Sequence, residues 1–311
     1  MFGSNNNNHL DKIAIIIPVH NRKDTTLRCL SNLAMLDKSN FNTTAIVVDD
    51  GSTDGTTHAV AQYFPETVIL KGDGNLWWAG AINLGFTYAL DNNYDYVYTI
   101  NDDIQIQPST LTSLYRTALT HKDTICSSIC LNADQQIVYA GFIRRGGLRG
   151  FKEYMQGLEY LSYTKISAVE VDSLSTRSTL IPVKLIRRFG FLDCQHFPHN
   201  YSDIEYFHRL KTNGCLLLVD MNSCIHSQGS DTNFHRLLLH LHFKDILRTF
   251  TDIKYANNIV TLYYRSFLGN TAIIGHLAFL RTISIHAVWI ILRILSGKHG
   301  FETLLKITRR L

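Results

Sequence analysis

The chain has 311 residues, of which 45% are hydrophobic and 18% charged, an ordinary globular composition with enough apolar residues for a sizeable core. Its length suits one large domain, or a domain with an appendage. The six cysteines are scattered without any CxxC pair, so we expect reduced structural thiols in a cytosolic protein and no disulfide framework.

Charge is distributed unevenly along the chain. From Arg265 to the end, seven Lys or Arg residues accompany a single acid, Glu302, which gives this tail a net charge of +6. Because the whole chain carries +4, the part before the tail carries −2. The basic residues of the tail are interleaved with Ile, Leu and Trp, so we expect an anionic surface as its neighbour and no nucleic acid.

The first hundred residues alternate between apolar runs and helical periodicity. They follow a polar, asparagine-rich lead (residues 1–10), which we expect to be disordered or vector-derived and which has no signal-peptide pattern. The apolar runs are typical of strands buried on both faces. Repeats of strand and helix predict a parallel, doubly wound α/β sheet with right-handed crossovers. The predicted strands are 13–18, 45–48, 68–70 and 96–100, and the predicted helices are 25–36 and 83–90.

Two of these strands end in acidic residues. Asp49 and Asp50 close one strand, and Asn101, Asp102 and Asp103 close another. Parallel strands share their carboxyl ends, so we expect both groups at the edge where ligands bind in open α/β sheets. Adjacent carboxylates repel each other there, and Mg²⁺ or Mn²⁺ that also holds nucleotide phosphates is the usual solution. By itself the triplet is equally compatible with a solvated turn.

Three motifs, taken in order, resemble the family 2 glycosyltransferases of the GT-A fold. They are Ile-Ile-Ile-Pro-Val-His-Asn-Arg (15–22), Val-Val-Asp-Asp-Gly-Ser-Thr-Asp-Gly (47–55) and Ile-Asn-Asp-Asp (100–103). The stretch 74–85, with its Trp-Trp pair, is similar to the bacterial polysaccharide branch that includes rhamnosyltransferases and galactofuranosyltransferases. The resemblance covers residues 13–230 and implies a nucleotide-sugar donor, a divalent metal and inversion at the anomeric carbon. The donor-binding positions that it implies are Pro18, His20, Asn21, Arg22, Asp49, Asp50, Gly51, Asn75, Trp78, Gly80, Asn101 and Asp102.

The resemblance also implies a metal site. The family's metal triplet is Asp-x-Asp, and Asn101 stands at its first position, which leaves Asp103 as the direct ligand and Asp102 as the second choice. His226 matches a family histidine that completes the site, and imidazole suits Mn²⁺ better than Mg²⁺. A lone histidine is also often structural, so this role stays open.

An acidic helix start follows at residues 202–210. We expect Ser202 or Asp203 to cap this helix. In the resembling family the segment reads Glu-Asp-x-(Asp/Glu)-x-x-x-Arg, and its Asp is the catalytic base. Asp203 matches that base, Glu205 and Arg209 match the later positions as helix and acceptor support, and Ser202 replaces the first Glu. Inverting transfer needs one such base and one Lewis acid.

The remaining elements have weaker signals. A basic, glycine-rich loop at 141–150 is either a lid or a solvated turn, and Arg177 is expected near a diphosphate. The apolar segment 273–295 is broken by four His or Arg residues. Its longest clean run, 287–292, is far shorter than the roughly 20 residues of a membrane span, so we expect a helix lying on anionic lipid or a homodimer contact. The other predicted helices are 111–119, 237–250 and 259–268, and the other predicted strands are 124–131, 136–142, an antiparallel region at 169–180, and 215–219.

The sequence therefore predicts a GT-A-type mixed α/β sheet at 11–235, divided into a nucleotide-binding half (11–105) and an acceptor half (106–235), with a helical C-terminal extension at 236–311. The expected reaction moves a sugar from dTDP-rhamnose or a UDP-sugar to a glycan or lipid-linked acceptor of a bacterial surface polysaccharide such as O-antigen. The expected place is the inner face of the plasma membrane. Two alternatives stay open: a sugar-phosphate nucleotidyltransferase and an inactive sugar-binding module.

Overall fold

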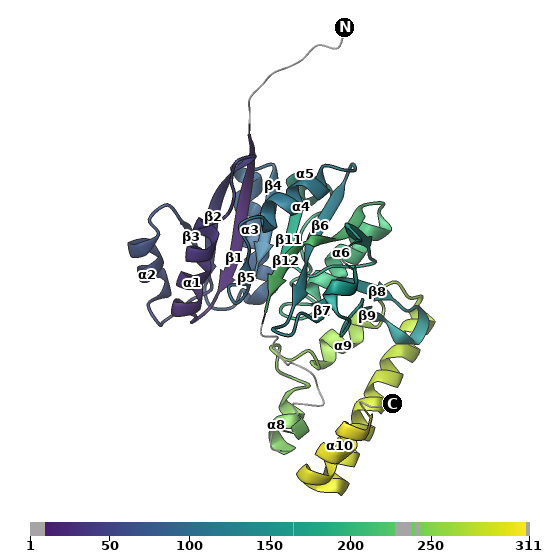
Figure 1. Ribbon diagram of the computed structural model, residues 1–311. Coiled ribbons are helices and arrows are strands. Elements are labelled where there is room, and N and C mark those ends of the chain that lie inside the picture. The colour runs from purple at the N-terminus through teal and green to yellow at the C-terminus, as the bar shows by residue number, and fades with distance from the viewer. Residues whose placement is uncertain (1–9, 164, 228–237, 240–242, 309–311) are drawn as a thin grey trace.

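The computed structural model describes residues 10–163, 165–227, 238–239 and 243–308. The expected lead at 1–10 lies outside these residues apart from Leu10, and part of the expected helix at 237–250 also lies outside them. Figure 1 shows a central sheet flanked by helices, from which the last helix projects.

The sheet is mixed and has ten strands in the part of the chain described. Its order is β10-β12-β6-β11-β4-β1-β2-β3, with β5 beside β12 and β7 beside β6. The first four strands are parallel, whereas β11 runs antiparallel to both β4 and β6. The strands are β1 (Asp11–Val19), β2 (Phe41–Asp49), β3 (Val68–Lys71), β4 (Tyr96–Ile100), β5 (Gln105–Ile106), β6 (Thr124–Leu131), β7 (Ile137–Tyr139), β10 (Ala168–Glu170), β11 (Ser178–Pro182) and β12 (Leu216–His226).

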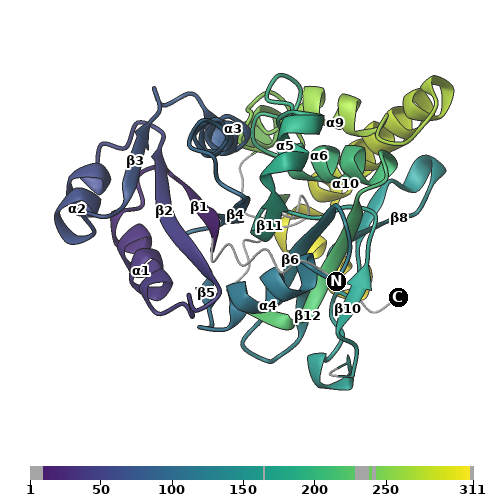
Figure 2. The same cartoon turned by 90° about the horizontal axis from the view of Figure 1, so that it is seen from above.

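Helices cover both faces of the sheet, as seen from above in Figure 2. Alternate residues of β1 enter two separate apolar clusters: Ala14 and Ile16 pack on one face, and Ile13, Ile15 and Ile17 on the other. The continuous apolar run in the sequence is therefore a strand buried on both sides. One face carries α3 (Trp77–Asp91), α5 (Val183–Phe189) and α6 (Ser202–Thr212), and the other carries α1 (Lys23–Ala34) and α4 (Thr110–Ala118), while α2 (Thr56–Tyr63) lies beside α1.

Most predicted strands and helices are confirmed, but three boundaries were wrong. Helix α3 begins at Trp77, six residues before the predicted start, so the Trp pair opens a helix. The predicted strand at 136–142 is two short strands, β7 and the first residue of β8. Strand β12 continues to His226 instead of ending at Val219.

The basic glycine-rich loop is neither a free lid nor a solvated turn. It forms a hairpin of β8 (Phe142–Arg144) and β9 (Phe151–Glu153), with the 3₁₀ turn η1 (Gly147–Arg149) at its tip, and a second such turn, η2 (Tyr160–Tyr163), follows. The Arg144 guanidinium donates to the carbonyl of Gly269 and, at 2.9 Å, to Oδ1 of Asn270. The hairpin is thus fastened to the C-terminal helices.

The C-terminal extension contains α8 (Phe243–Arg248), α9 (Ile259–Arg265) and α10 (Ala272–Thr308). In α10, Gly297 has φ 64° and ψ −178°, values that glycine adopts without steric cost. Beyond it the chain folds back, and Phe301 meets Trp289 with ring centroids 5.8 Å apart. Leu238 and Ile246 pack in the same small apolar cluster.

The expectation that the apolar segment 273–295 is too interrupted to span a membrane was wrong. By length and composition, the helical segment 272–305, which bends at Gly297, is long and apolar enough to cross a membrane. Only 6% of its most apolar window is buried. Six exposed apolar residues of α10 recur at helical spacing and form what we call the apolar stripe: Ile273, Leu277, Leu280, Val288, Ile291 and Leu295.

Candidate functional site

The loops that follow β1 and β2 are bound to each other. His20 Nδ1 lies 2.6 Å from the carbonyl oxygen of Asp50. The backbone N–H of Asn21 donates to Ser52 Oγ (2.8 Å), and its side-chain oxygen accepts from the N–H of Thr53 (2.7 Å). Asn21 has φ 52°, a left-handed conformation in which asparagine is enriched. Two predicted donor-binding residues, His20 and Asn21, therefore fix the shape of this edge.

The carboxylates after β2 hold the next loop. Asp50 accepts hydrogen bonds from the N–H groups of Gly74 (2.8 Å) and Trp77 (3.0 Å), while Asp49 binds its own turn in the same way. Gly51 has φ 72°, and a Cβ there would lie 2.9 Å from the Gly74 backbone. A glycine is required at this close approach, and the Asp50 carboxylate fixes the loop that starts α3.

The triplet after β4 is the most charged part of the site. Arg22 Nε lies 3.1 Å from Oδ2 of Asp102, and its Nη2 lies 3.2 Å from Oδ2 of Asp103. Burial raises the pKa of Asp102 to about 6; Arg22 opposes the rise and Asp103 adds to it. The side-chain oxygen of Asn101 is buried and has no hydrogen-bond partner among the described residues. Arg22 thus forms an ion pair with each of the two carboxylates, and the Asn101 oxygen next to them in the chain has no hydrogen-bond donor among the described residues.

Asp102, Asp103, Arg22 and His226 line one open cavity of about 1080 Å³. His226 ends β12 and is paired in register with Gln105 of β5. A carboxylate, an imidazole and an amide oxygen are donors that fit Mn²⁺. The described residues contain no group of three or more His, Cys, Asp or Glu gathered closely enough to hold a metal ion, so the fit rests on these few donors.

Asp203 is connected to this edge through Arg177. Strands β4 and β11 are antiparallel neighbours, and the N–H of Asn101 donates to the carbonyl of Arg177 at 3.0 Å. The Arg177 charge also acts on Asp203, whose pKa is nevertheless raised because burial outweighs it. A partly buried carboxylate with a raised pKa has properties suited to a general base.

The predicted capping of α6 was wrong. The cap position is Tyr201, in a left-handed conformation (φ 69°), and it makes no side-chain cap bond. Asp203 Oδ1 accepts from the N–H of Ile204 at 2.8 Å, and the Ser202 hydroxyl is buried without a partner among the described residues. A non-glycine residue held at positive φ costs of order 1 kcal/mol or more, which is typical of functional sites.

Glu205 and Arg209 stabilise α6 and its neighbour. They form an ion pair of 2.7 Å, four residues apart on one helix face. Arg209 also donates to the carbonyls of Phe189 (2.6 Å), the last residue of α5, and of Phe191 (2.8 Å) just after it. Their contacts are therefore those of helix support.

The remaining predicted donor residues lie around the start of α3 or, for Pro18, in β1, and they do not line the open cavity. Trp78 is half-buried and donates its indole N–H to Thr176 Oγ1 at 2.8 Å. Trp77 packs edge-on against His199, with centroids 5.6 Å apart. Pro18 is buried in β1, and Asn75 and Gly80 flank the helix start.

Sequence reasoning missed several residues of the cavity wall. Arg28 on α1 lines the cavity but belongs to none of the sequence motifs. Asn132 and Asp134 follow the end of β6, which runs parallel to β12. Like Asp103, they follow the carboxyl end of a strand, so they could have been predicted if β6 had been placed parallel to β4 in the sheet.

Comparison with known proteins relates the first half of the chain to a sequence family. Residues 14–161 match the family model described as Glycosyl transferase family 2. This match covers slightly less than half of the 311-residue chain. An uncharacterized protein of Methanocaldococcus jannaschii is 32% identical over 106 residues, and this match spans 32% of the present chain and 44% of that protein.

Several solved structures resemble this chain over most of its length at low identity. GalNAc-T7, crystallised with UDP, GalNAc and Mn²⁺, has a TM-score of 0.58 at 11% identity over 95% of this chain and 59% of its own. The mannosyltransferase PcManGT of Pyrobaculum calidifontis, in complex with GDP-Man and Mn²⁺, has a TM-score of 0.54 at 14% identity over 92% and 85%. TarS of S. aureus has a TM-score of 0.52 at 14% identity over 81% and 69%. At these identities the likeness is one of fold.

The raised pKa of Asp102 predicts a pH-dependent stability. A rise from 3.8 to about 6 corresponds to about 3 kcal/mol. The folded protein binds this proton more tightly than the unfolded chain, so the stabilisation is complete below about pH 4 and is lost as the pH rises through about 6. Asp102→Asn should therefore gain stability relative to the wild type over this range, measured as urea unfolding free energy from pH 4 to 7.5. A difference that does not change with pH would contradict the raised pKa.

Proposed function

We propose that the protein is an inverting, metal-dependent glycosyltransferase that acts on a nucleotide-diphosphate sugar. The observation that supports this best is the gathering of Asp103 and His226 on one open cavity, with Asp203 joined to the same edge through Arg177. The finer proposal is rhamnosyl or galactofuranosyl transfer from a dTDP- or UDP-sugar, and it rests on the Trp-Trp stretch alone. The acceptor in this proposal is a glycan or lipid-linked glycan of a bacterial surface polysaccharide.

Asp203 accepts the proton of the acceptor hydroxyl in this mechanism. The hydroxyl oxygen forms a bond to the anomeric carbon while the bond to the nucleoside diphosphate breaks on the opposite face, which inverts the configuration. Burial raises the pKa of Asp203 and so brings it closer to the range in which a base takes a proton efficiently. A divalent metal held by Asp103 and His226, when bound, supplies charge that stabilises the departing diphosphate. Arg22 keeps the pair of carboxylates in place.

Nucleotide binding tests the metal role of Asp103. We expect a thermal-shift panel of dTDP, UDP and GDP to identify one nucleotide that stabilises the wild type with Mn²⁺ more than with EDTA. A ligand at 100 times its Kd stabilises by about 2.7 kcal/mol. Asp103→Ala should lose the Mn²⁺-dependent part, whereas Asp91→Ala, at the exposed end of α3, should keep it. An unchanged Mn²⁺-dependent shift in Asp103→Ala would overturn the metal assignment.

The base is tested by an isosteric change. Asn has nearly the shape of Asp but takes no proton, so Asp203→Asn should hold donor and Mn²⁺ affinity within a few-fold while transfer falls by about 10² or more. Transfer is measured with labelled donor and lipid-linked glycan as acceptor. Glu205→Gln is the matched control, because its carboxylate is engaged by Arg209. If Asp203→Asn turns over normally and Glu205→Gln does not, Glu205 is the base.

We further propose that the protein lies at the cytoplasmic face of the membrane through its tail. The tail carries +6, and the apolar stripe of α10 is exposed. Each basic residue near an anionic surface contributes about 1 kcal/mol, and buried apolar residues add to it.

Vesicle sedimentation tests this placement. Changing Leu277, Leu280 and Ile291 to Gln in the full chain should release the protein from vesicles rich in phosphatidylglycerol, while nucleotide binding survives. Vesicles of phosphatidylcholine alone are the control for charge. If the variant still sediments but its mass in solution falls by half, the stripe is a homodimer contact and the membrane proposal fails.

A further inference from the structure

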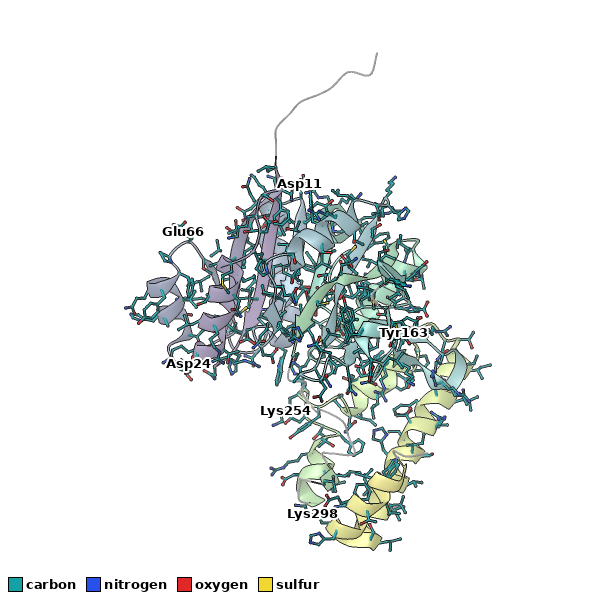
Figure 3. The ribbon with its side chains drawn as sticks, in the orientation of Figure 1. Asp11, Asp24, Glu66, Tyr163, Lys254 and Lys298 are labelled. Atoms are coloured by element: carbon teal, nitrogen blue, oxygen red, sulfur yellow. The ribbon has the colours of Figure 1, made fainter. Side chains whose placement is uncertain are left out.

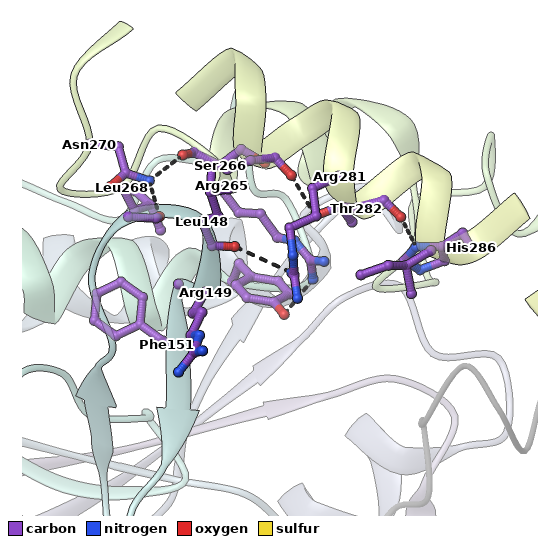
Figure 4. Close-up of a pocket in the computed structure, with 15 residues that line it drawn as sticks. Leu148, Arg149, Phe151, Arg265, Ser266, Leu268, Asn270, Arg281, Thr282 and His286 are labelled. Carbon is purple, nitrogen blue, oxygen red and sulfur yellow. Dashed lines mark hydrogen bonds between the residues drawn. The ribbon is translucent and has the colours of Figure 1, made fainter. Parts of the chain in front are cut away.

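A second cavity, of about 230 Å³, lies between the GT-A domain and the C-terminal helices. One wall is the tip of the β8–β9 hairpin, and the other is formed by the end of α9, the turn after it and the first half of α10 (Figure 4). Arg149, Arg265, Arg281 and His286 line it, together with Tyr201 and with no carboxylate. This cavity is separate from the one that contains Asp103.

The three arginines of this cavity are not neutralised. Arg265 Nη1 donates to the Tyr201 hydroxyl at 2.5 Å, and its guanidinium lies over the Tyr201 ring, 4.8 Å from the centroid. Arg281 Nη1 makes a long contact of 3.4 Å with the carbonyl of Leu148. Within the described part of the chain, no carboxylate forms an ion pair with any of the three. Like charges that share a cavity repel each other, and an anion would relieve that repulsion.

The cavity is built from fixed walls. Asn270 donates to the carbonyl of Gly147 (3.1 Å) on the hairpin and to that of Ser266 (2.8 Å) after α9. Arg144 binds Asn270 from the hairpin side at 2.9 Å. These bonds hold the two walls at a set distance. Figure 4 shows Arg265 and Arg281 reaching into the cavity from the helices, with Arg149 on the hairpin opposite.

The cavity adjoins the proposed base through Tyr201. This residue forms part of the wall and lies two positions before Asp203 at the start of α6. Its left-handed conformation (φ 69°) turns the chain just before the helix, and its ring is held against Arg265. The cavity is therefore linked to the start of α6, the helix that carries Asp203, through the backbone of Tyr201.

We propose that this cavity binds the phosphate or diphosphate group of a lipid-linked acceptor. The inference rests on the proposed glycosyltransferase function and names the acceptor class for it. Guanidinium groups present paired N–H donors that match phosphate oxygens, and three of them suit a multiply charged group. The apolar stripe runs along α10, the helix that carries Arg281, so a lipid chain attached to the phosphate would have an apolar surface beside it.

Binding of inorganic pyrophosphate to the full chain tests the proposal. The titration is done calorimetrically in EDTA, so that metal-assisted binding at the Asp103 cavity is suppressed. Arg265→Gln and Arg281→Gln should each weaken binding by about tenfold or more, the scale for one charge-assisted hydrogen bond. Lys298→Gln removes the same charge at the far end of the tail (Figure 3) and should change binding less than twofold. Arg281 is exposed, so its variant tests the cavity even if Arg265→Gln fails to fold. Equal weakening by Lys298→Gln, or unchanged affinity in Arg281→Gln, would overturn the cavity as an anion site.

Vesicle sedimentation and nucleotide binding separate the possible sources of the phosphate and the two proposals. Loss of sedimentation with phosphatidylglycerol vesicles in Arg281→Gln, with pyrophosphate affinity intact, would make it a headgroup contact and also overturn the acceptor role. Nucleotide binding with Mn²⁺ should survive in both arginine variants. If the wild type binds pyrophosphate but no nucleotide, the glycosyltransferase proposal fails while the anion site stands.

Discussion

The pairing of β4 with β11 is the constraint on which the site depends. The parallel half of the sheet ends at β4, and the antiparallel strand β11 joins it to β6 and β12. This one register places Asn101 against Arg177, and through Arg177 it connects the acidic triplet with Asp203. Because β11 is antiparallel to both neighbours, β4, β6 and β12 all point the same way. Their carboxyl ends therefore share an edge, and Asp103, Asp134 and His226 reach the same cavity.

When no other cation is bound, Arg22 makes the acidic triplet compatible with folding. Two adjacent carboxylates with one of them buried would be strongly unfavourable, and the ion pairs of 3.1 and 3.2 Å compensate them. Arg22 remains 43% exposed, so it can move away at modest cost. The same side chain that stabilises the free protein would have to share or yield its place when a divalent cation binds.

The parallel half of the sheet, and many of the residues at its carboxyl edge, could be predicted from the sequence. Apolar runs that end in Asp or Asn mark buried strands and the place where they stop, so Asp50 and Asp103 were readable from local pattern. The start of α3 was not, because Trp and Gly have low helix propensity and tertiary bonds to Asp50 fix it instead. The arginine cavity could not be predicted: the loop 141–150 and the tail were recognised as basic, but only the folded chain brings Arg149, Arg265 and Arg281 together.

The apolar stripe and Arg281 share one helix, and their angular relation has a consequence of its own. At about 100° per residue, Arg281 lies at the border of the stripe and within one turn of Leu280. The helix therefore fixes the direction in which its apolar stripe faces relative to the anion cavity. A single residue inserted between Arg281 and Val288 would rotate the distal half of the stripe by about 100° relative to the cavity, whereas four inserted residues would nearly restore the phase. If the protein binds lipid as proposed, the register of the tail as well as its hydrophobicity would determine how the domain is oriented toward the lipid surface.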